Sequence, residues 1–541
     1  IRDLVRSGGL GDVYKRQPGV SAPSTLVCHD AAGQPTEVHT PAGRTVTTKR
    51  DEAGRLVELK GTDASGATVR RTTDYDRPTN NGLGRIARTH DATGTTRFGY
   101  DALTRPAEVS FEPSAELGAG LPNVAQAYTT TFSYSAVGGL KSFSLSGLRK
   151  PIQVRYTRDE AGRTRTLTSD GRTLVSGIVF DAEGRIVETQ LGNGTSMQRA
   201  YDPLTGTLRA QRHLSPIGTP IEALAYDYDA ADNVVHESRS QEGVLVSQKS
   251  HVFDAMDRLA STELWIRGQN RQHTYSYSAG GNIQNAAGAA YTYAQPSNPQ
   301  AVSSLERNGT TERALSYGPD GEATTDDALD PQTGLLVHRV LETDALGCLT
   351  HVSDPEQTTE LFCGAGGSVA ARRTTSNATG EVSARIDVAG IGELRPNEGI
   401  FLARIPLGGT TTVEEAYSLD TGNLDTAKSG YIVADTRGST LARLGYSAGE
   451  VKSHETEYDA WGDAVAISAL PRPNHAYTSS EPDPGTGYYH YGPRNYDPKL
   501  RRWLSPDPLI WLMPDRQTAW GEQLNLYGLS LIHISEPTRP Y

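Results

Sequence analysis

The chain has 541 residues, with 52 lysines and arginines against 64 aspartates and glutamates, and its formal net charge is −12. This acidic balance argues against a general nucleic-acid binder, because such proteins carry a basic patch or stripe. No apolar run comes near the ~20 residues of a membrane-spanning helix. Three cysteines, Cys28, Cys348 and Cys363, are too few and too scattered for a disulfide framework or a CxxC metal site.

The two ends of the chain are related through the genetic code. The reverse complement of a DNA that encodes residues 12–17 also encodes residues 529–534, and compatible codons continue outward from both segments. This pattern is typical of a sequencing adapter translated at both ends, and such segments are excluded from fold reasoning. We therefore expect residues 1–17 and 529–541 to be adapter sequence and the remainder, residues 18–528, to be a fragment of a longer protein.

A short unit recurs through residues 18–528. It consists of an aromatic residue and Asp, or Asp alone, then two or three small or polar residues, then Gly-Arg or Asn, and then a stretch rich in β-branched residues. Copies begin at Asp51, Tyr100, Asp159, Phe180, Tyr201, Tyr228, Phe253, Tyr317 and Tyr458. The five aspartates from Asp159 to Asp254 follow one another at steps of 22, 21, 27 and 25 residues, which is typical of a repeat architecture.

Each unit predicts a β-hairpin. The Asp side chain can accept hydrogen bonds from backbone N–H groups a few positions on, and Gly or Asn then takes the left-handed conformation that ends a short hairpin loop. The aromatic residue before Asp is expected to close its hairpin by cross-strand packing. Since one hairpin cannot bury its apolar face alone, the units must stack. The sequence therefore predicts an all-β fold of repeated hairpins in a spiral sheet, without separate globular domains.

These units resemble the YD repeat of RHS proteins. The resemblance is closer toward the C-terminus, where residues 431–439 (YIVADTRGS) and 458–462 (YDAWG) are similar to the DxxGS and YDxxG hairpins of that family. Residues 487–508 (GYYHYGPRNYDPKLRRWLSPDP) resemble the RHS repeat-associated core signature, GLYYxGxRYYDPxxGRFxSPDP, and residues 525–527 (NLY) resemble the motif that follows it. The chain departs from the signature at His490, Asn495 and Arg501 and by an insertion at 511–522.

The resemblance implies a YD/RHS repeat β-shell over residues 18–430 and an RHS repeat-associated core segment over residues 431–528. In the family, a β-strand ribbon spirals into a hollow cocoon around a C-terminal polypeptide, usually a toxin, as in the Tc toxin C component. The implied function is a partial encapsulating shell of a bacterial polymorphic toxin that acts in competition. Its implied partners are its own C-terminal toxin cargo, a secretion apparatus and an immunity protein, and its implied location is secreted or cell-surface.

The alternative is a cell-surface adhesion or carbohydrate-binding module, similar to wall-associated YD-repeat proteins. Exposed aromatic faces could stack on sugars, although such residues more often fill a core. Four of the five tryptophans lie in the last fifth of residues 18–528: Trp461, Trp503, Trp511 and Trp520. The sequence downstream of this chain discriminates the two functions, since a toxin domain supports encapsulation and an anchor supports adhesion.

Three residues are candidates for the aspartate-dependent autoproteolysis that, in the family, frees the cargo. Asp497 and Asp507 are ten residues apart, and paired carboxylates that share a proton can act as acid and base. Both also fit Asp-Pro turns, in which each carboxylate accepts a backbone N–H. Arg494 could hold a carboxylate as a bidentate partner or line a polar wall.

Other motifs favour ordinary structural roles. The GxSxG string at 445–449 lies between two family hairpins, where a glycine turn is expected in any case. His475 and His490 have no further ligands at metal spacing, and the acidic triplet within 227–232 lacks the glycine and glutamate of an EF-hand. No metal and no cofactor are expected.

Overall fold

The computed structural model describes residues 12–13, 25–78, 81–330, 332–388, 390–408, 411–447, 454–467, 476–480, 482–506 and 527. Strands dominate this part of the chain, in a 40-stranded sheet and a separate sheet of three strands. The predicted all-β fold is confirmed. The helical segments there are α1 (Ala115–Gly118) and the 3₁₀ turn η2 (Tyr477–Ser479), and no helix within the described ranges is long and apolar enough to cross a membrane.

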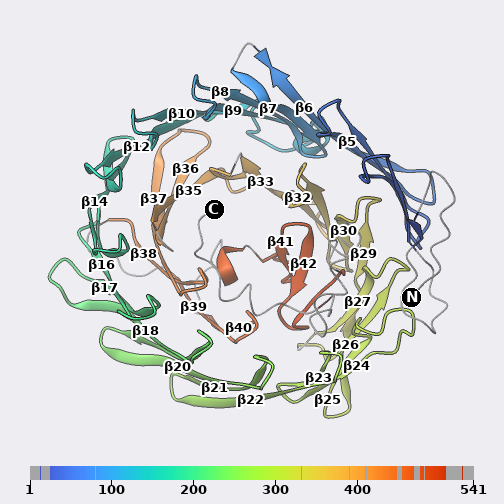
Figure 1. Ribbon diagram of the computed structural model, residues 1–541. Coiled ribbons are helices and arrows are strands. Elements are labelled where there is room, and N and C mark those ends of the chain that lie inside the picture. The colour runs from blue at the N-terminus through green and yellow to red at the C-terminus, as the bar shows by residue number, and fades with distance from the viewer. Residues whose placement is uncertain are drawn as a thin grey trace.

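The large sheet is an antiparallel meander that winds through two revolutions (Figure 1). The first revolution contains β1 (Asp12–Val13), β2 (Leu26–His29), β3 (Pro35–His39), β4 (Thr45–Arg50), β5 (Leu56–Thr62), β6 (Thr68–Arg77), β7 (Gly82–Asp91), β8 (Gly94–Tyr100), β9 (Pro106–Pro113), β10 (Tyr128–Tyr134), β11 (Leu140–Ser146), β12 (Ile152–Arg158), β13 (Thr164–Ser169), β14 (Arg172–Phe180), β15 (Ile186–Leu191), β16 (Ser196–Tyr201), β17 (Leu208–Leu214), β18 (Pro220–Tyr228), β19 (Val234–Gln241), β20 (Val244–Phe253), β21 (Leu259–Ile266), β22 (Gln269–Tyr277), β23 (Ile283–Ala286), β24 (Ala289–Thr292), β25 (Ser304–Arg307) and β26 (Thr310–Tyr317).

The second revolution contains β27 (Ala323–Leu329), β28 (Leu336–Val337), β29 (Val340–Thr343), β30 (Leu349–Ser353), β31 (Gln357–Cys363), β32 (Val369–Ser376), β33 (Val382–Val388), β34 (Gly392–Arg395), β35 (Ile400–Gly408), β36 (Thr411–Ser418), β37 (Leu424–Ala434), β38 (Thr440–Gly445), β39 (His454–Tyr458) and β40 (Ala464–Ile467). The small sheet of β41 (Tyr489–Tyr491), β42 (Arg494–Asp497) and β43 (Arg502–Trp503) lies at the centre (Figure 1). The predicted start of the core segment, residue 431, falls inside β37.

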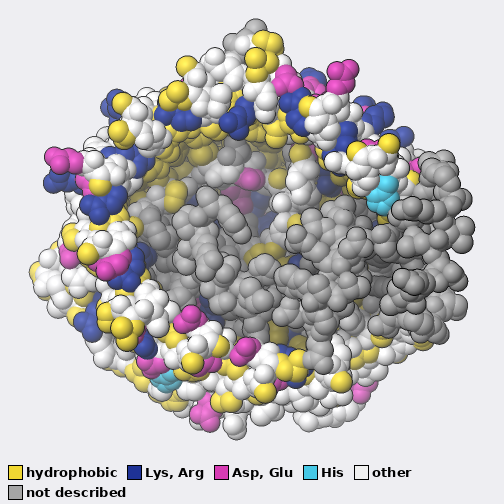
Figure 2. Space-filling model, in the orientation of Figure 1, with side chains coloured by type: hydrophobic (Ala, Val, Ile, Leu, Met, Phe, Trp, Pro, Cys, Tyr) yellow, Lys and Arg dark blue, Asp and Glu magenta, His cyan; other side chains and the backbone are white. Residues whose placement is uncertain are grey.

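The second revolution lies inside the first. Near the start of the first revolution, Thr40 Oγ1 donates to Asp320 Oδ2 across 280 residues of sequence. Farther along it, Arg239 Nη1 of β19 donates to Glu457 of β39 across 218 residues. Because the sequence separation shortens along the chain, the second revolution is the tighter one. Figure 2 shows charged side chains around the rim of the molecule and hydrophobic side chains on the wall inside the upper rim.

The repeat turns form as predicted. At the turn between β4 and β5, Asp51 Oδ1 accepts hydrogen bonds from the N–H groups of Ala53 (3.0 Å) and Arg55 (2.9 Å), and Asp51 Oδ2 accepts from Arg55 Nε (2.8 Å). Gly54 has a φ of 78°, in the left-handed region where glycine has no steric cost. The same Asp-to-Arg pattern recurs at Asp101, Asp159, Asp181 and Asp254.

The aromatic side chain of a repeat contacts the preceding turn, which differs from the expected packing within its own hairpin. The Tyr75 ring lies 4.4 Å from Arg55 Cζ, and its hydroxyl donates to the carbonyl of Leu56 (3.2 Å). Four further arginine–aromatic pairs have 4.4 to 4.8 Å spacings: Arg105–Tyr134, Arg163–Phe180, Arg185–Tyr201 and Arg258–Tyr277. The repeat signature therefore joins successive turns along one edge of the ribbon.

The main hydrophobic core lies between the two revolutions. Leu145, Val154 and Leu174 of the first revolution and Phe401 and Val413 of the second are all fully buried in one cluster. Side chains alternate along a strand, so each strand can bury one face against the other layer. The wall is therefore two layers thick where the revolutions overlap.

The three cysteines form no disulfide framework among the described residues, but two of them make one disulfide. Cys348 and Cys363 are bonded, with their Cα atoms 6.5 Å apart. Because β30 and β31 form a hairpin in which His351 pairs with Glu360, residues three positions farther out on each side face one another. The hairpin register brings the two cysteines together, and the cysteine spacing alone does not show it.

Candidate functional site

The core signature folds into an aromatic plug at the centre of the spiral. Tyr489 pairs with Tyr496, and Tyr496 pairs with Trp503, across the three-stranded sheet. The Trp503 ring lies 5.4 Å from that of Tyr496 and 5.8 Å from that of Tyr491. This cluster also contains Leu224 of the first revolution. The plug therefore packs the core segment directly against the outer wall.

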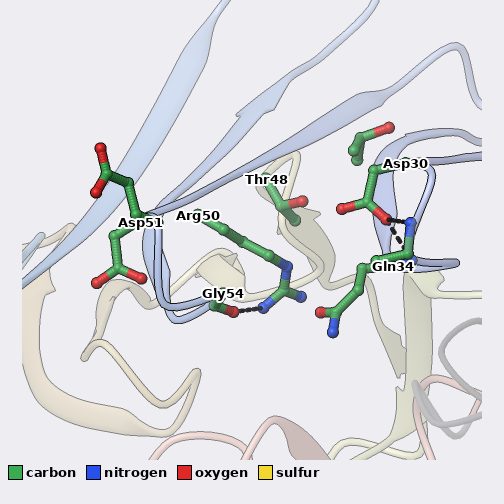
Figure 3. Close-up of a pocket in the computed structure, with 9 residues that line it drawn as sticks. Asp30, Gln34, Thr48, Arg50, Asp51 and Gly54 are labelled. Carbon is green, nitrogen blue, oxygen red and sulfur yellow. Dashed lines mark hydrogen bonds between the residues drawn. The ribbon is translucent and has the colours of Figure 1, made fainter.

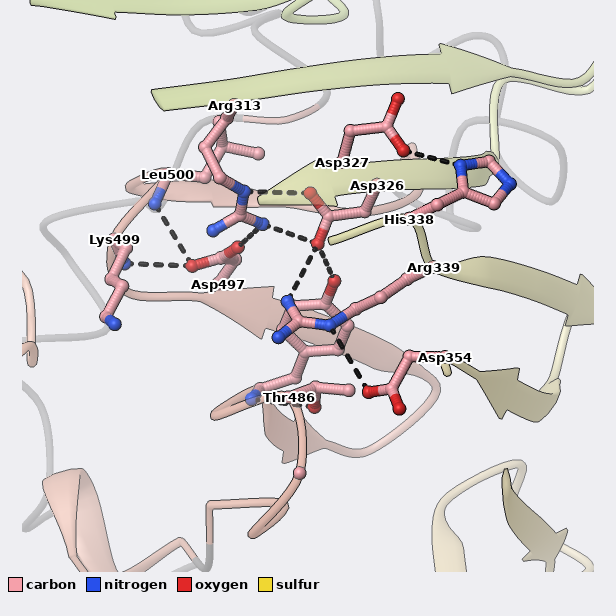
Figure 4. A network of polar contacts seen from close by, with 12 residues as sticks. Arg313, Asp326, Asp327, His338, Arg339, Asp354, Thr486, Asp497, Lys499 and Leu500 are labelled. Carbon is pink, nitrogen blue, oxygen red and sulfur yellow. Dashed lines mark hydrogen bonds and ion pairs between the residues drawn. The ribbon is translucent and has the colours of Figure 1, made fainter. Parts of the chain in front are cut away.

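Asp497 lies in a buried network of charges beside this plug (Figure 4). Its Oδ1 accepts the N–H groups of Lys499 (2.9 Å) and Leu500 (3.1 Å), and its Oδ2 contacts Arg313 Nη2. The same guanidinium holds Asp326 through Nε (2.8 Å) and Nη2 (2.7 Å). One arginine of β26 thus joins a carboxylate of β27 to a carboxylate of the core segment.

Arg313 determines the electrostatics of this network. Burial raises the pKa of Asp326, but Arg313 and the hydrogen bond from the Tyr488 hydroxyl outweigh it, so the pKa of Asp326 is lowered. Burial and the nearby Asp326 raise the pKa of Tyr488 well above its usual range. The guanidinium contacts both carboxylates, which makes the arrangement an ion network of charge-assisted hydrogen bonds.

The three predicted catalytic residues have different settings. Asp497 caps a turn and belongs to the Arg313 network, which matches the structural role considered for it. Arg494 Cζ lies 4.2 Å from the Trp503 ring centroid. Asp507 lies outside the described residues. Catalytic roles for all three remain predictions.

A second buried ion network was missed by sequence reasoning. Arg239, in β19, donates from Nε and Nη2 to both oxygens of Glu222 (3.1 Å each) and from Nη1 to Glu457 (2.7 Å) and the carbonyl of Thr456 (3.1 Å). All three charged residues are buried. One sequence signal was available, because Glu222 alternates with buried Leu224 in β18 and so occupies an inward position.

A pocket of about 340 Å³ opens between the turn at residues 30–34 and the repeat turn at residues 51–55 (Figure 3). Its lining residues are Asp30, Ala32, Gln34, Thr36, Thr48, Arg50, Asp51, Glu52 and Gly54. Gln34 stands where other turns have the stacked arginine, and Arg50, which donates to the Gly54 carbonyl (3.1 Å), stands where they have the aromatic residue. The pocket is thus the space that an arginine–aromatic pair fills elsewhere, and no aromatic residue lines it.

The candidate metal ligands have other partners. Asp229 of the acidic triplet caps its repeat turn, with Oδ1 accepting from the N–H groups of Ala231 and Asn233 (2.9 Å each). His490 Nδ1 contacts Asn495 Oδ1, and burial lowers the pKa of His490; His475 lies outside the described residues.

One mixed group could hold a metal ion. Single ligand atoms of Cys28, Glu37 and His39 lie within 4.8 Å of one another. Within this group, His39 Nε2 lies 3.3 Å from Glu37 Oε1, and His39 Nδ1 lies 3.1 Å from Thr45 Oγ1. These contacts already engage both ring nitrogens of His39.

Comparison with known proteins agrees with the repeat and the fold. A family model described as RHS Repeat matches residues 29–68, while a sequence search of curated proteins finds no match. The crystal structure of TcdB2-TccC3 aligns with a TM-score of 0.73 at 18% identity, over 96% of this chain and 28% of that chain. The crystal structure of TcdB2-TccC3 without its hypervariable C-terminal region gives 0.68 at 18% identity, over 96% and 27%.

A Tc holotoxin pore from Photorhabdus luminescens gives a TM-score of 0.66 at 18% identity, over 94% of this chain and 26% of that chain. The chain thus spans little more than a quarter of the length of these solved chains. The match to the RHS Repeat model is confined to residues 29–68. Over nearly its whole length the chain has the fold of the TcdB2-TccC3 shell.

Proposed function

We propose that this chain is part of the encapsulating shell of a bacterial RHS-type polymorphic toxin and that it encloses a C-terminal toxin encoded beyond it. The observation that carries the proposal is the two-layered spiral wall, whose fold matches the TcdB2-TccC3 shell over 96% of the chain. Each sheet edge that pairs with a neighbour is closed to other polypeptides, which suits a wall that isolates a harmful chain. A secretion apparatus, an immunity protein and a secreted or cell-surface location follow from this function.

Two measurements test encapsulation. Long-read sequencing of the source DNA past Gly528 should reveal a DPxGL-like site followed by an unrelated domain of roughly 100–150 residues, a typical domain size. In the protein with its natural C-terminus, that domain should resist protease in the native state and be digested after denaturation. A stop codon or a membrane anchor directly after Gly528 would contradict the proposal.

The carbohydrate-binding alternative receives less support from the described residues. Trp461 and Trp503 are only 4% and 6% exposed, so neither offers a flat face to a sugar. Trp511 and Trp520 lie outside the described ranges. Sugar binding by the purified chain, lost on substitution of these last two tryptophans, would favour the adhesive function.

Autoproteolysis in cis remains part of the proposal for the intact protein. Asp497→Asn and Asp507→Asn would each be compared with the parent protein carrying its natural C-terminus, with cleavage read on a gel. Because Asp497 neutralises Arg313, thermal unfolding of Asp497→Asn must be measured beside its cleavage. A folded Asp497→Asn variant that cleaves at the parent rate would show that Asp497 serves the wall and not the chemistry.

A further inference from the structure

The turn at the end of the first revolution is contacted by the N-terminal hairpin of β3 and β4. This seam turn, Gly318–Glu322, connects β26 to β27. Asp320 accepts a hydrogen bond from Thr40 Oγ1 (2.7 Å), and Arg44 forms ion pairs with Asp320 (3.3 Å) and Glu322. Side chains of the Arg44 pairs are at most 14% exposed. These contacts close the first revolution on itself.

The seam turn also holds Tyr527. The Tyr527 side chain is 1% exposed, and its ring meets Tyr317 edge-on at 5.9 Å. Its hydroxyl donates to the carbonyl of Gly321 and accepts from the side-chain amide of Asn298. Its own carbonyl accepts the N–H of Trp503 (3.2 Å). Tyr527 is thus bonded both to the outer wall and to the central plug.

The space for this tyrosine depends on glycine at position 321. A Cβ there would lie 2.6 Å from the Tyr527 hydroxyl oxygen and 3.2 Å from Pro506 Cγ. Gly321 also has a φ of 89°, which side chains rarely adopt. The seam turn is therefore shaped to receive this side chain.

We infer that Tyr527 is a latch that couples the C-terminal end of the core segment to closure of the first revolution. The Tyr527 hydroxyl is bonded to Gly321, and the two acidic residues that hold the N-terminal hairpin flank this glycine directly. Withdrawal of the tyrosine leaves the Gly321 carbonyl and the Asn298 amide without these partners and removes a ring from the side of Tyr317. The seam turn then shifts and loosens Asp320 and Glu322 from the N-terminal hairpin. This coupling goes beyond the proposed function, because it holds whether or not the shell encloses a cargo.

Hydrogen exchange of the full 541-residue chain, followed by mass spectrometry, tests the latch. The reporter is the N–H of Ala42, which donates to Asp320 (2.8 Å) and does not contact Tyr527. Tyr527→Phe keeps the ring and removes both hydroxyl bonds, and we expect about five- to tenfold faster exchange at Ala42. Tyr201→Phe is the matched control, because it removes a tyrosine hydroxyl bond to the Ile186 carbonyl, away from the seam.

Two glycine substitutions and one substitution on the other side of the seam complete the test. Gly321→Ala should accelerate exchange at Ala42 as Tyr527→Phe does, whereas Gly184→Ala, at a φ of 83° with nothing within 4 Å of its Cβ, should not. Since coupling is reciprocal, Arg44→Ala should accelerate exchange of the Trp503 N–H that donates to Tyr527. Unchanged exchange at Ala42 in Tyr527→Phe, or at Trp503 in Arg44→Ala, would overturn the latch.

Discussion

Removal of Arg239 should separate the two revolutions locally. Arg239→Leu leaves the buried carboxylates of Glu222 and Glu457 without the guanidinium that donates three hydrogen bonds to them, at 2.7 to 3.1 Å. Breaking a buried ion pair by removing one partner costs about 3–5 kcal/mol. Local opening should therefore become roughly 10²- to 4 × 10³-fold more frequent, at about 1.4 kcal/mol per factor of ten. Hydrogen exchange of the β38 and β39 amides measures this opening directly.

Arg267→Ala is the matched control, because Arg267 pairs with Glu455 of the same strand β39 but its side chain is 61% exposed. An exposed pair contributes at most about 1 kcal/mol, so exchange should change less than tenfold. Equal effects of Arg239→Leu and Arg267→Ala would refute the argument from burial. A triple variant, Arg239→Met with Glu222→Leu and Glu457→Leu, should recover most of the lost protection, because all three charges of this network are then removed together and the neighbouring Lys249 keeps its ion pair with Glu237 (2.7 Å).

Three further predictions concern separate features. Gln34→Arg with Arg50→Tyr should fill the pocket between the turns at residues 30–34 and 51–55. The new cation–π pair should raise the free energy of unfolding by about 0.5–1 kcal/mol, measured by hydrogen exchange of the β2–β5 amides in increasing urea. Burial lowers the pKa of His251 from 6.5 to about 4, so between pH 4 and 6.5 the unfolded chain binds more protons than the folded chain. The free energy of unfolding should therefore fall by about 3 kcal/mol as the pH drops from 6.5 to 4. His251→Gln should remove this part of the pH dependence in thermal melts. Reduction of the Cys348–Cys363 disulfide, which closes a loop of 15 residues, should lower stability by about 3 kcal/mol, whereas Cys348→Ser with Cys363→Ser should make the melting temperature insensitive to reductant.

The repeat turns could be predicted from sequence because every interaction in them is local. Asp51 caps N–H groups two and four residues ahead, and Gly54 supplies the left-handed residue of the same loop. The aromatic residue was expected to pack within its own hairpin, but Tyr75 contacts Arg55 in the preceding repeat turn, about 20 residues earlier in the chain. The spacing of units was visible in the sequence, but the direction in which each aromatic side chain points was not.

The contacts between revolutions could not be predicted in the same way. Arg313 meets Asp497 across 184 residues and Arg239 meets Glu457 across 218 residues, and no periodicity in the chain relates these positions. What the sequence does carry is the anomaly of Glu222, a charged residue in line with buried apolar ones. An inward charge in a strand marks the need for a partner from another layer, although it does not say which strand supplies it.

The buried charges also help to fix how the second revolution is aligned with the first. Hairpins of similar shape are nearly interchangeable as packing surfaces, so apolar contact alone would tolerate a second revolution displaced by one hairpin. Such a slip moves every strand by two positions, about 9.6 Å at the usual spacing, and would take Glu457 out of reach of Arg239 and Asp497 out of reach of Arg313. A displacement in either direction along the spiral leaves several charges buried and unpaired, and each such charge costs several kcal/mol of stability. The ion networks thus make a single alignment favourable.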